Sequence, residues 1–157
     1  SIMPTNLYGP NDNYNLESSH VIPALIRKIH YGKINNHSEV IVWGTGKPLR
    51  EFLHVDDLAE ACIFSMEKLE SNNLYNDLNV SHINVGSGKE ISIKELSFLL
   101  AKIIGFKGEI IFDSTYPDGT PRKLMDSSKI YKMGWSPKIA LKDGLFSTYS
   151  DFMQNNN

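Results

Sequence analysis

The sequence has little cysteine, no dominant charge of either sign and no long hydrophobic run. Its single cysteine, Cys62, excludes an internal disulfide framework and suits the reducing cytoplasm, where we expect the protein. No apolar stretch reaches the roughly 20 residues that cross a bilayer, and no basic segment followed by a hydrophobic block opens the sequence. The 16 basic and 18 acidic residues are scattered, which excludes a charge pattern for binding nucleic acid or an anionic membrane.

The sequence also lacks the loops that bind phosphate in many nucleotide enzymes. A Walker A loop needs Ser or Thr after Gly-Lys, where WGTGKP and VGSGKE have Pro48 and Glu90. A dinucleotide fingerprint needs a third glycine, where the chain has Leu49 and Ile91. No tyrosine is followed by a lysine four residues later, so the Tyr-x-x-x-Lys pair of short-chain reductases is absent. We interpret both glycine pairs as turns and assign no metal site.

Apolar periodicity and turn residues predict strands that alternate with helices. Strands are expected over residues 1–7, 39–44, 50–55, 81–86 and 108–113, and residues 114–123 are expected to form a loop. Helices are expected from about residue 20, from 56 or 57 to about 69, over 92–105, over 127–134 and over 141–152. This alternation is typical of an α/β fold with a parallel component.

The helix ends are predicted from capping residues. Gly32 is the expected stop of the first helix, and Asp56 or Asp57 is the expected N-cap of the second. Ser92 is the expected N-cap of the third helix, where Glu95 would complete a capping box.

Four separated segments carry a family resemblance. They read MPTNLYGPNDNYNLESSHVIPALIRK, VWGTGKPLREFLHVDDLA, HINVGSGKEISIKEL and PDGTPRKLMDSSKIYKMGW. In this order they resemble the C-terminal half of the GDP-L-fucose synthases, which belong to the extended short-chain dehydrogenase/reductase family. Many sugar-nucleotide epimerases and dehydratases share the Tyr-Gly-Pro and Arg-x-Phe-x-His-Val-x-Asp frame, whereas PTNLYGPNDN, SSHVIPALI and PDGTPRK narrow the resemblance to these synthases.

The resemblance implies an α/β fold that is the C-terminal part of an extended family member. A remnant of a Rossmann-type parallel sheet would be joined to a small α/β substrate domain. Residues 1–19 and about 51–86 would be Rossmann-derived, and about 20–50 and 87–157 would form mainly the substrate-binding domain. Because the glycine fingerprint and the Tyr-x-x-x-Lys pair lie upstream in such enzymes, residues 1–157 are expected to be a single fragment whose partner is the missing N-terminal Rossmann half.

The implied chemistry gives a role to the first residues. Epimerisation at C3 and C5 of a 4-keto sugar needs a base on one face of each centre and an acid on the other. By resemblance His20 is the general acid, opposite a cysteine of the upstream half; the alternative is a polar residue that starts a helix. Pro4, Thr5, Asn6 and Leu7 match the segment that passes the nicotinamide end of NADPH, with His20 beside them in the cofactor site. The alternative for this segment is a buried strand end.

Five residues are assigned to substrate by the resemblance. Arg50 matches an arginine that pairs with the diphosphate, for which a guanidinium is well shaped. Trp43 matches a substrate-contacting tryptophan, with core packing as its alternative. Lys28 stands where bacterial members carry arginine, so a bidentate phosphate contact is lost. Asp118 and Lys123 match a loop that closes over the nucleotide, with a turn-rich surface loop as the alternative.

The implied activity of the intact protein is NADPH-dependent conversion of GDP-4-keto-6-deoxymannose to GDP-L-fucose, with NADP as the cofactor and a GDP-sugar as the substrate. The resemblance also suggests a homodimer, and the fragment alone is expected to be inactive. Two alternatives remain open at this point. One is another extended-family sugar-nucleotide epimerase or reductase, and the other is a sugar-nucleotide binding module without catalysis.

Overall fold

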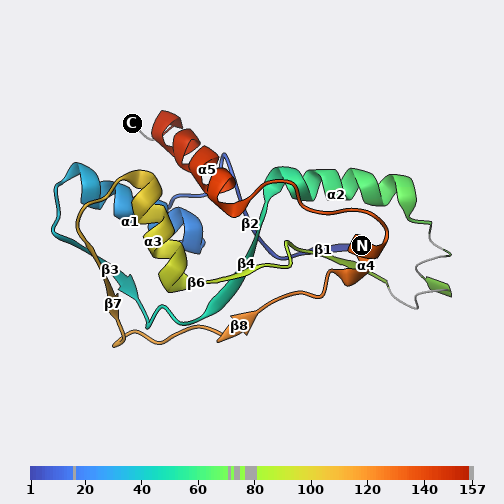
Figure 1. Ribbon diagram of the computed structural model, residues 1–157, viewed down its shortest axis with the longest axis horizontal. Coiled ribbons are helices and arrows are strands. Elements are labelled where there is room, and N and C mark those ends of the chain that lie inside the picture. The colour runs from blue at the N-terminus through green and yellow to red at the C-terminus, as the bar shows by residue number, and fades with distance from the viewer. Residues whose placement is uncertain (16, 71, 73–74, 77–80, 156–157) are drawn as a thin grey trace.

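The protein is an elongated molecule of two lobes, with β4 (Leu49–His54) and the strands paired with it running between them (Figure 1). The computed structural model describes residues 1–15, 17–70, 72, 75–76 and 81–155. The strands are β1 (Ile2–Pro4), β2 (Asn6–Tyr8), β3 (Glu39–Trp43), β4 (Leu49–His54), β5 (Ile83–Val85), β6 (Glu90–Ser92), β7 (Glu109–Asp113) and β8 (Arg122–Lys123). The helices are α1 (Val21–Ile34), α2 (Val55–Lys68), α3 (Ile93–Ile104), α4 (Ser128–Lys132) and α5 (Leu141–Asn155).

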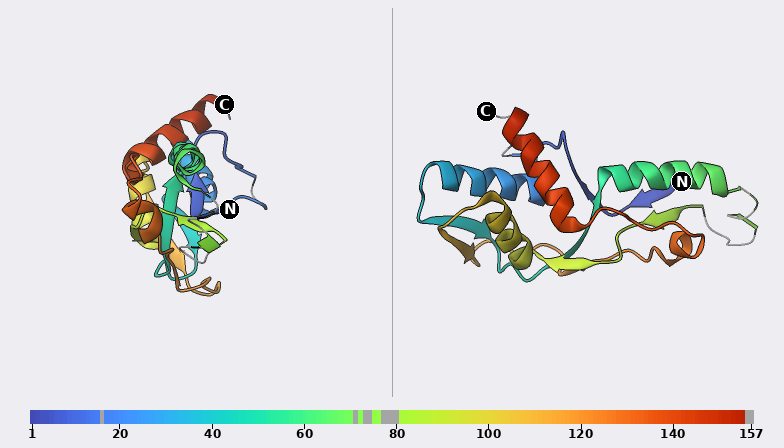
Figure 2. Two further views of the ribbon diagram at one scale, coloured as in Figure 1. Left: turned by 90° about the vertical axis from the view of Figure 1, so that its right-hand side faces the viewer. Right: turned by 45° about the horizontal axis from the view of Figure 1, so that its top comes forward.

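The larger lobe contains α1, α3, α5, β3 and β7, and the smaller lobe contains α2, α4, β1 and β5. Figure 2 shows the same two groups at opposite ends of the long axis, with β4 running between them. Among the described residues, no helix has both the length and the apolar character needed to span a membrane.

Strand pairing confirms the predicted α/β fold with a parallel component. The pairs β1–β5, β2–β4 and β3–β7 are parallel, β8 is parallel to β4, and β6 is antiparallel to it. The prediction of one strand over residues 1–7 is wrong at Thr5. The Thr5 N–H donates to the Val85 carbonyl, whereas Asn6 already pairs with Phe52 of β4. The chain therefore leaves one sheet and enters another within a single residue.

Each lobe has its own hydrophobic core, and β4 contributes to both. Phe52 packs in the larger core with residues such as Ile26 and Leu100, whereas Leu53 packs in the smaller core with Ile83. Consecutive side chains of a strand point to opposite faces, which explains why neighbours in sequence serve different cores. The strand thus fixes the two lobes relative to each other.

The helix ends agree with the sequence at α3 and differ at α1 and α2. Ser92 and Glu95 form the predicted capping box. Gly32 does not end α1, which runs to Ile34, because this buried glycine leaves room for Val40 to pack against the helix. The helix therefore continues through a residue that helices usually avoid.

The prediction of Asp56 or Asp57 as the cap of α2 is also wrong. His54 is the N-cap, and its Nδ1 accepts the Asp56 N–H at 3.3 Å. Asp57 is buried, and its carboxylate accepts the backbone N–H groups of Lys138 and Ile139 at 2.9 and 3.1 Å. Asp57 thus holds the segment before α5 against the start of α2.

Glu51 of β4 is fully buried and joins three segments by hydrogen bonds. Its carboxylate accepts the backbone N–H groups of Gly88 at 2.7 Å and Met125 at 3.0 Å. Its main-chain carbonyl accepts the Thr5 hydroxyl at 3.3 Å and the Asn6 amide at 2.8 Å. A buried polar group is costly without partners, so these bonds specify where the three segments lie.

We expect Glu51→Gln to lower the free energy of unfolding by about 2 kcal/mol, the size of a hydrogen bond to a charged group. The new NH2 group would face a backbone N–H, and that N–H would lose its acceptor. Urea unfolding followed by circular dichroism measures the change. The control Glu60→Gln removes an exposed ion pair with Lys138 and should cost less than about 1 kcal/mol. An equal loss in the two variants would contradict the role of Glu51.

Candidate functional site

A cavity of about 420 Å³ lies at the carboxyl end of β3. The first half of α1, the turn between β3 and β4 and the loop after β7 line it. Four of the five residues assigned to substrate meet here, namely Lys28, Trp43, Arg50 and Asp118. Pockets of this size hold small molecules, and they usually combine an apolar lining with a few polar groups. Here the apolar part comes from α1, from β3 and the turn after it, from Ile93 and from Pro117, and the cations are Lys28 and Arg50.

Trp43 and Lys28 are in direct contact at one end of this cavity. The Trp43 ring is 62% exposed, so core packing does not explain this tryptophan. The Lys28 ammonium lies 4.8 Å from the ring centroid and donates to the Ile41 carbonyl at 3.2 Å. Burial lowers the pKa of Lys28. The Ile41 carbonyl and the face of the Trp43 ring therefore hold the Lys28 ammonium in a defined position, although lysine lacks the planar guanidinium of arginine.

Arg50 is held in the cavity wall by two carbonyl groups. Its Nη1 donates to the carbonyls of Leu49 at 2.7 Å and Thr120 at 2.6 Å. A guanidinium has five N–H donors, so these bonds leave Nε and Nη2 donors for an anion. The side chain thus combines a fixed position with remaining capacity to bind.

Asp118 closes the loop after β7 onto the turn after β3. Its Oδ1 accepts the Thr45 N–H at 2.8 Å, and its Oδ2 accepts the Thr45 hydroxyl at 2.6 Å. The Thr45 hydrogen bonds hold the pKa of Asp118 below its usual range. Gly44 has a φ of 84° and lies against the Asp118 carboxylate, where a Cβ would collide. The carboxylate therefore binds the protein itself and shapes the cavity.

Lys123 lies apart from the other four, beside a second depression of about 420 Å³ lined by Pro4, Thr5 and Asn6. The expected loop over 114–123 is wrong at its end, because Lys123 belongs to β8 and pairs in register with Arg50. The side chains of Thr5 and Asn6 both donate to the Glu51 carbonyl. They are therefore occupied within the protein, which leaves mainly backbone and the exposed Lys123 to face a ligand.

Leu7 and His20 line neither depression. Leu7 is partly buried and packs against the smaller core. His20 is exposed at the N-cap of α1, and its side chain makes no capping hydrogen bond. Its neighbours Ser19 and Val21 do line the first cavity. His20 is thus adjacent in sequence to two lining residues, and its imidazole does not cap the helix.

The sequence analysis missed residues on both sides of the first cavity. Glu17 and Ser19 line it from the loop before α1. Tyr116 stacks on Trp43 with ring centroids 4.6 Å apart and an angle of 11° between the planes. An aromatic residue in a turn-rich segment was the available signal for Tyr116. The loop before α1 carried no comparable signal, because its polar residues also form ordinary turns.

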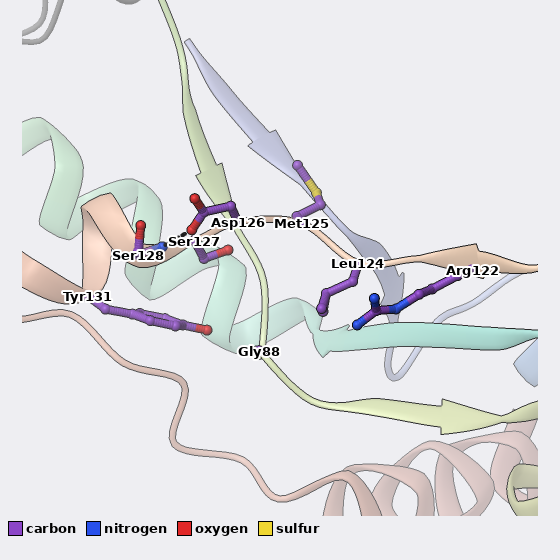
Figure 3. A pocket seen from close by; sticks show the side chains of 8 residues that line it. All are labelled: Gly88, Arg122, Leu124, Met125, Asp126, Ser127, Ser128 and Tyr131. Carbon is purple, nitrogen blue, oxygen red and sulfur yellow. Dashed lines mark hydrogen bonds between the residues drawn. The ribbon is translucent and has the colours of Figure 1, made fainter.

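A third pocket of about 570 Å³ contains none of the predicted site residues. Figure 3 shows it between the turn at Gly88 and the segment that carries Tyr131. Arg122 forms two hydrogen bonds with Glu90, at 2.8 and 2.7 Å, and Tyr131 donates to the Gly86 carbonyl at 2.8 Å. The side chains of Arg122 and Tyr131 are thus paired with the protein. Among the described residues, no group of His, Cys, Asp and Glu could hold a metal ion.

Comparison with known proteins establishes the family. The model of the NAD dependent epimerase/dehydratase family matches residues 1–85, more than half of the 157 residues. The chain belongs to this family. The relationship accounts for the parallel strands β1, β2, β4 and β5, which all lie within this range.

The chain is similar to GDP-L-fucose synthases over almost its whole length. It is 58% identical over 153 residues to putative GDP-L-fucose synthase 2 of Arabidopsis thaliana, covering 98% of this chain and 44% of the relative. It is 51% identical over 156 residues to the GDP-L-fucose synthase of Escherichia coli, covering 99% of this chain and 49% of the relative. The chain thus spans about half the length of the curated relatives it matches.

A solved structure supports the same relationship. The GDP-L-fucose synthetase of Naegleria fowleri bound to NADP superimposes with a TM-score of 0.85 at 28% identity, over 98% of this chain and 46% of that one. The expected fold, the C-terminal part of an extended short-chain dehydrogenase/reductase, is confirmed by this similarity.

Replacing Asp118 by Ala tests how the first cavity is shaped. We expect the Thr45 amide to exchange its hydrogen faster, because both hydrogen bonds to the carboxylate are lost. Hydrogen–deuterium exchange read by mass spectrometry on peptides that contain residues 44–47 measures the effect. Asp126→Ala is the matched control, since Asp126 caps Ser128 in another exposed turn. Unchanged exchange at Thr45 in the Asp118 variant would show that the loop is held otherwise.

Proposed function

We propose that this chain is the substrate-binding part of a GDP-L-fucose synthase. In this reaction GDP-4-keto-6-deoxymannose is epimerised at C3 and C5 and then reduced at C4 to give GDP-L-fucose. The observation that carries the proposal is the first cavity, where Lys28, Trp43, Arg50 and Asp118 meet from four separate segments. An aromatic face with two cations suits a nucleoside diphosphate. The identity with synthases of this name supports the choice of GDP-sugar.

His20 is the proposed general acid of the two epimerisations. A proton removed at C3 or C5 on one face of the ring has to be replaced from the other. The His20 imidazole is exposed, free of capping bonds and next to two residues that line the cavity. A protonated ring nitrogen of an imidazole can donate its proton, which suits this role.

Arg50 is the proposed contact for the diphosphate. His20 precedes Lys28 by eight residues, a rise of about 12 Å along α1. Arg50 lines the same cavity as Lys28, and its free N–H donors suit phosphate oxygens. The sugar would then lie near His20, the diphosphate near Arg50, and the base near Lys28 and Trp43.

The cofactor proposed is NADP, with residues 4–7 as one wall of its site. The second depression supports this, because Pro4 and Thr5 line it at the carboxyl end of β1, which is parallel to β5, and open α/β sheets bind ligands at such ends. NADPH supplies the hydride for C4 when it is bound. The backbone of this segment would orient the nicotinamide, and Lys123 would add positive charge beside it.

The proposal also covers the N-terminal half and the second subunit with which residues 1–157 would assemble. The glycine fingerprint and the Tyr-x-x-x-Lys pair would come from an N-terminal Rossmann half, and relatives of about twice this length are consistent with such a half. Residues 1–19 and about 51–86 would complete that domain, and about 20–50 and 87–157 would form mainly the substrate domain. The intact protein would act as a cytoplasmic homodimer.

We expect His20→Asn in the intact protein to slow epimerisation by about 10²- to 10⁴-fold, the usual contribution of one acid or base. The measurement is incorporation of solvent deuterium at C3 and C5 of GDP-4-keto-6-deoxymannose, followed by NMR. Binding of GDP should be unchanged. His37→Asn is the matched control, because His37 is exposed at the other end of α1.

Other outcomes point elsewhere. Unchanged product formation by the His20 variant would favour another sugar-nucleotide epimerase or reductase that needs no acid at this position. Selective GDP binding without any turnover by the unchanged protein would favour a binding module.

A further inference from the structure

Trp43 has two different neighbours, and only one of them is in the cavity. Lys28 and Trp43 both line the cavity, whereas Tyr116 does not. The Tyr116 ring lies nearly parallel to the indole, 4.6 Å from it between centroids. The two rings are 42% and 62% exposed, so neither is held by core packing. Tyr116 therefore supports the indole from outside the cavity, and Lys28 covers it from within.

We infer that Tyr116 is a positioning residue for nucleobase binding. By stacking on the Trp43 ring it fixes the orientation of the indole, whose other face forms one wall of the space for the base, which we call the base slot. The inference rests on one part of the proposed function, namely that the first cavity binds a nucleoside diphosphate. Parallel aromatic rings attract each other, and a fixed ring stacks a base at lower entropic cost than a mobile one. Trp43 has no other aromatic partner among the described residues.

Two anchors fix Tyr116 in the loop after β7. On one side, the Asp113 carboxylate accepts the Thr115 N–H at 3.0 Å and the Thr115 hydroxyl at 2.6 Å. On the other side, Asp118 is bonded to Thr45, which follows Trp43 by two residues. The loop is thus tied at both ends and presents the tyrosine ring to the indole. A ring on an untied loop would have no fixed orientation.

Lys28 occupies the face of Trp43 that a base needs. Its ammonium is 4.8 Å from the ring centroid, and its one hydrogen bond to the described residues is the 3.2 Å contact with the Ile41 carbonyl. A base that stacks on Trp43 displaces this ammonium, which then turns toward the phosphates of the same ligand. The cation–π contact is replaced by a stack and a charge pair, so little binding energy is lost in the exchange.

The test compares Tyr116→Ala with Tyr116→Phe in the intact protein. GDP, ADP and UDP are titrated while tryptophan emission is recorded. Trp135, the other tryptophan of residues 1–157, is 4% exposed in the smaller core, and the part of the ligand-dependent change that is lost in a Trp43→Phe variant is the part that reports on Trp43. We expect Tyr116→Ala to weaken binding of the preferred nucleotide by about two- to tenfold, the value of one ring pair. Tyr116→Phe keeps the ring and should bind as the unchanged protein does.

Inorganic pyrophosphate, measured by competition against the preferred nucleotide, separates a base effect from general damage. Tyr116→Ala should leave pyrophosphate affinity unchanged, since no base is present. Equal weakening of nucleotide and pyrophosphate would overturn the inference, as would full nucleotide affinity in Tyr116→Ala. The control Phe146→Ala removes another exposed ring, on α5, and should change neither affinity.

The same titration separates this inference from the proposed function. Preference for UDP or ADP by the unchanged protein would refute the GDP-sugar proposal, while the Tyr116 variants would still test the base slot. Preference for GDP with no effect in Tyr116→Ala would overturn the slot and leave the proposed function intact. Failure of the unchanged protein to bind any of the three nucleotides would overturn both.

Discussion

The buried carboxylate of Glu51 is the constraint on which the arrangement of the chain depends. Burying a carboxylate without hydrogen bonds costs much free energy, so few arrangements of the surrounding chain are compatible with its position. Here the N–H groups of Gly88 and Met125 satisfy it, while its own carbonyl holds the side chains of Thr5 and Asn6. Glu51 of β4 therefore positions three segments by hydrogen bonds, namely the N-terminal crossing between sheets, the turn before β6 and the segment after β8. The two cores on either side of this strand follow from its alternating side chains.

Both depressions are built outward from the same strand. Arg50 precedes Glu51 and enters the first cavity, while Lys123 pairs with Arg50 in register and faces the second. Adjacent strands lie about 4.8 Å apart. The positive side chains of Arg50 and Lys123 are therefore held close together, although each lines a different depression. An extended ligand with charge at its centre could thus be contacted from β4, and a second ligand in the other depression would be contacted from β8. The strand that joins the lobes is also the one that separates the proposed substrate and cofactor regions.

Local sequence signals predicted the elements whose stability is local. The capping box of Ser92 and Glu95 was predictable because both partners lie within one turn, and the alternation in β3 and β7 marked these strands equally well. The predictions that were wrong concern features that depend on residues elsewhere in the chain. Gly32 stays helical because Val40 packs there, and the strand over 1–7 is divided because Thr5 and Asn6 pair with different strands. For the site, the family resemblance named residues that do meet in one cavity, but nothing in the local sequence linked Tyr116 to Trp43.

The polar groups of the first cavity are already bonded to the protein before any ligand is considered. Arg50 donates to two carbonyls, Asp118 accepts from Thr45 twice, and Lys28 donates to the Ile41 carbonyl. Such bonds fix side chains that would otherwise lose rotamer freedom on binding, and this loss is one of the main costs of association. They also divide the residues by role. Arg50 keeps spare donors and can bind while it stays in place, Asp118 has both oxygens engaged and can only shape the wall, and Lys28 has to move. Of the three, a change at Lys28 is therefore expected to act mainly by uncovering the exposed Trp43 ring beside it.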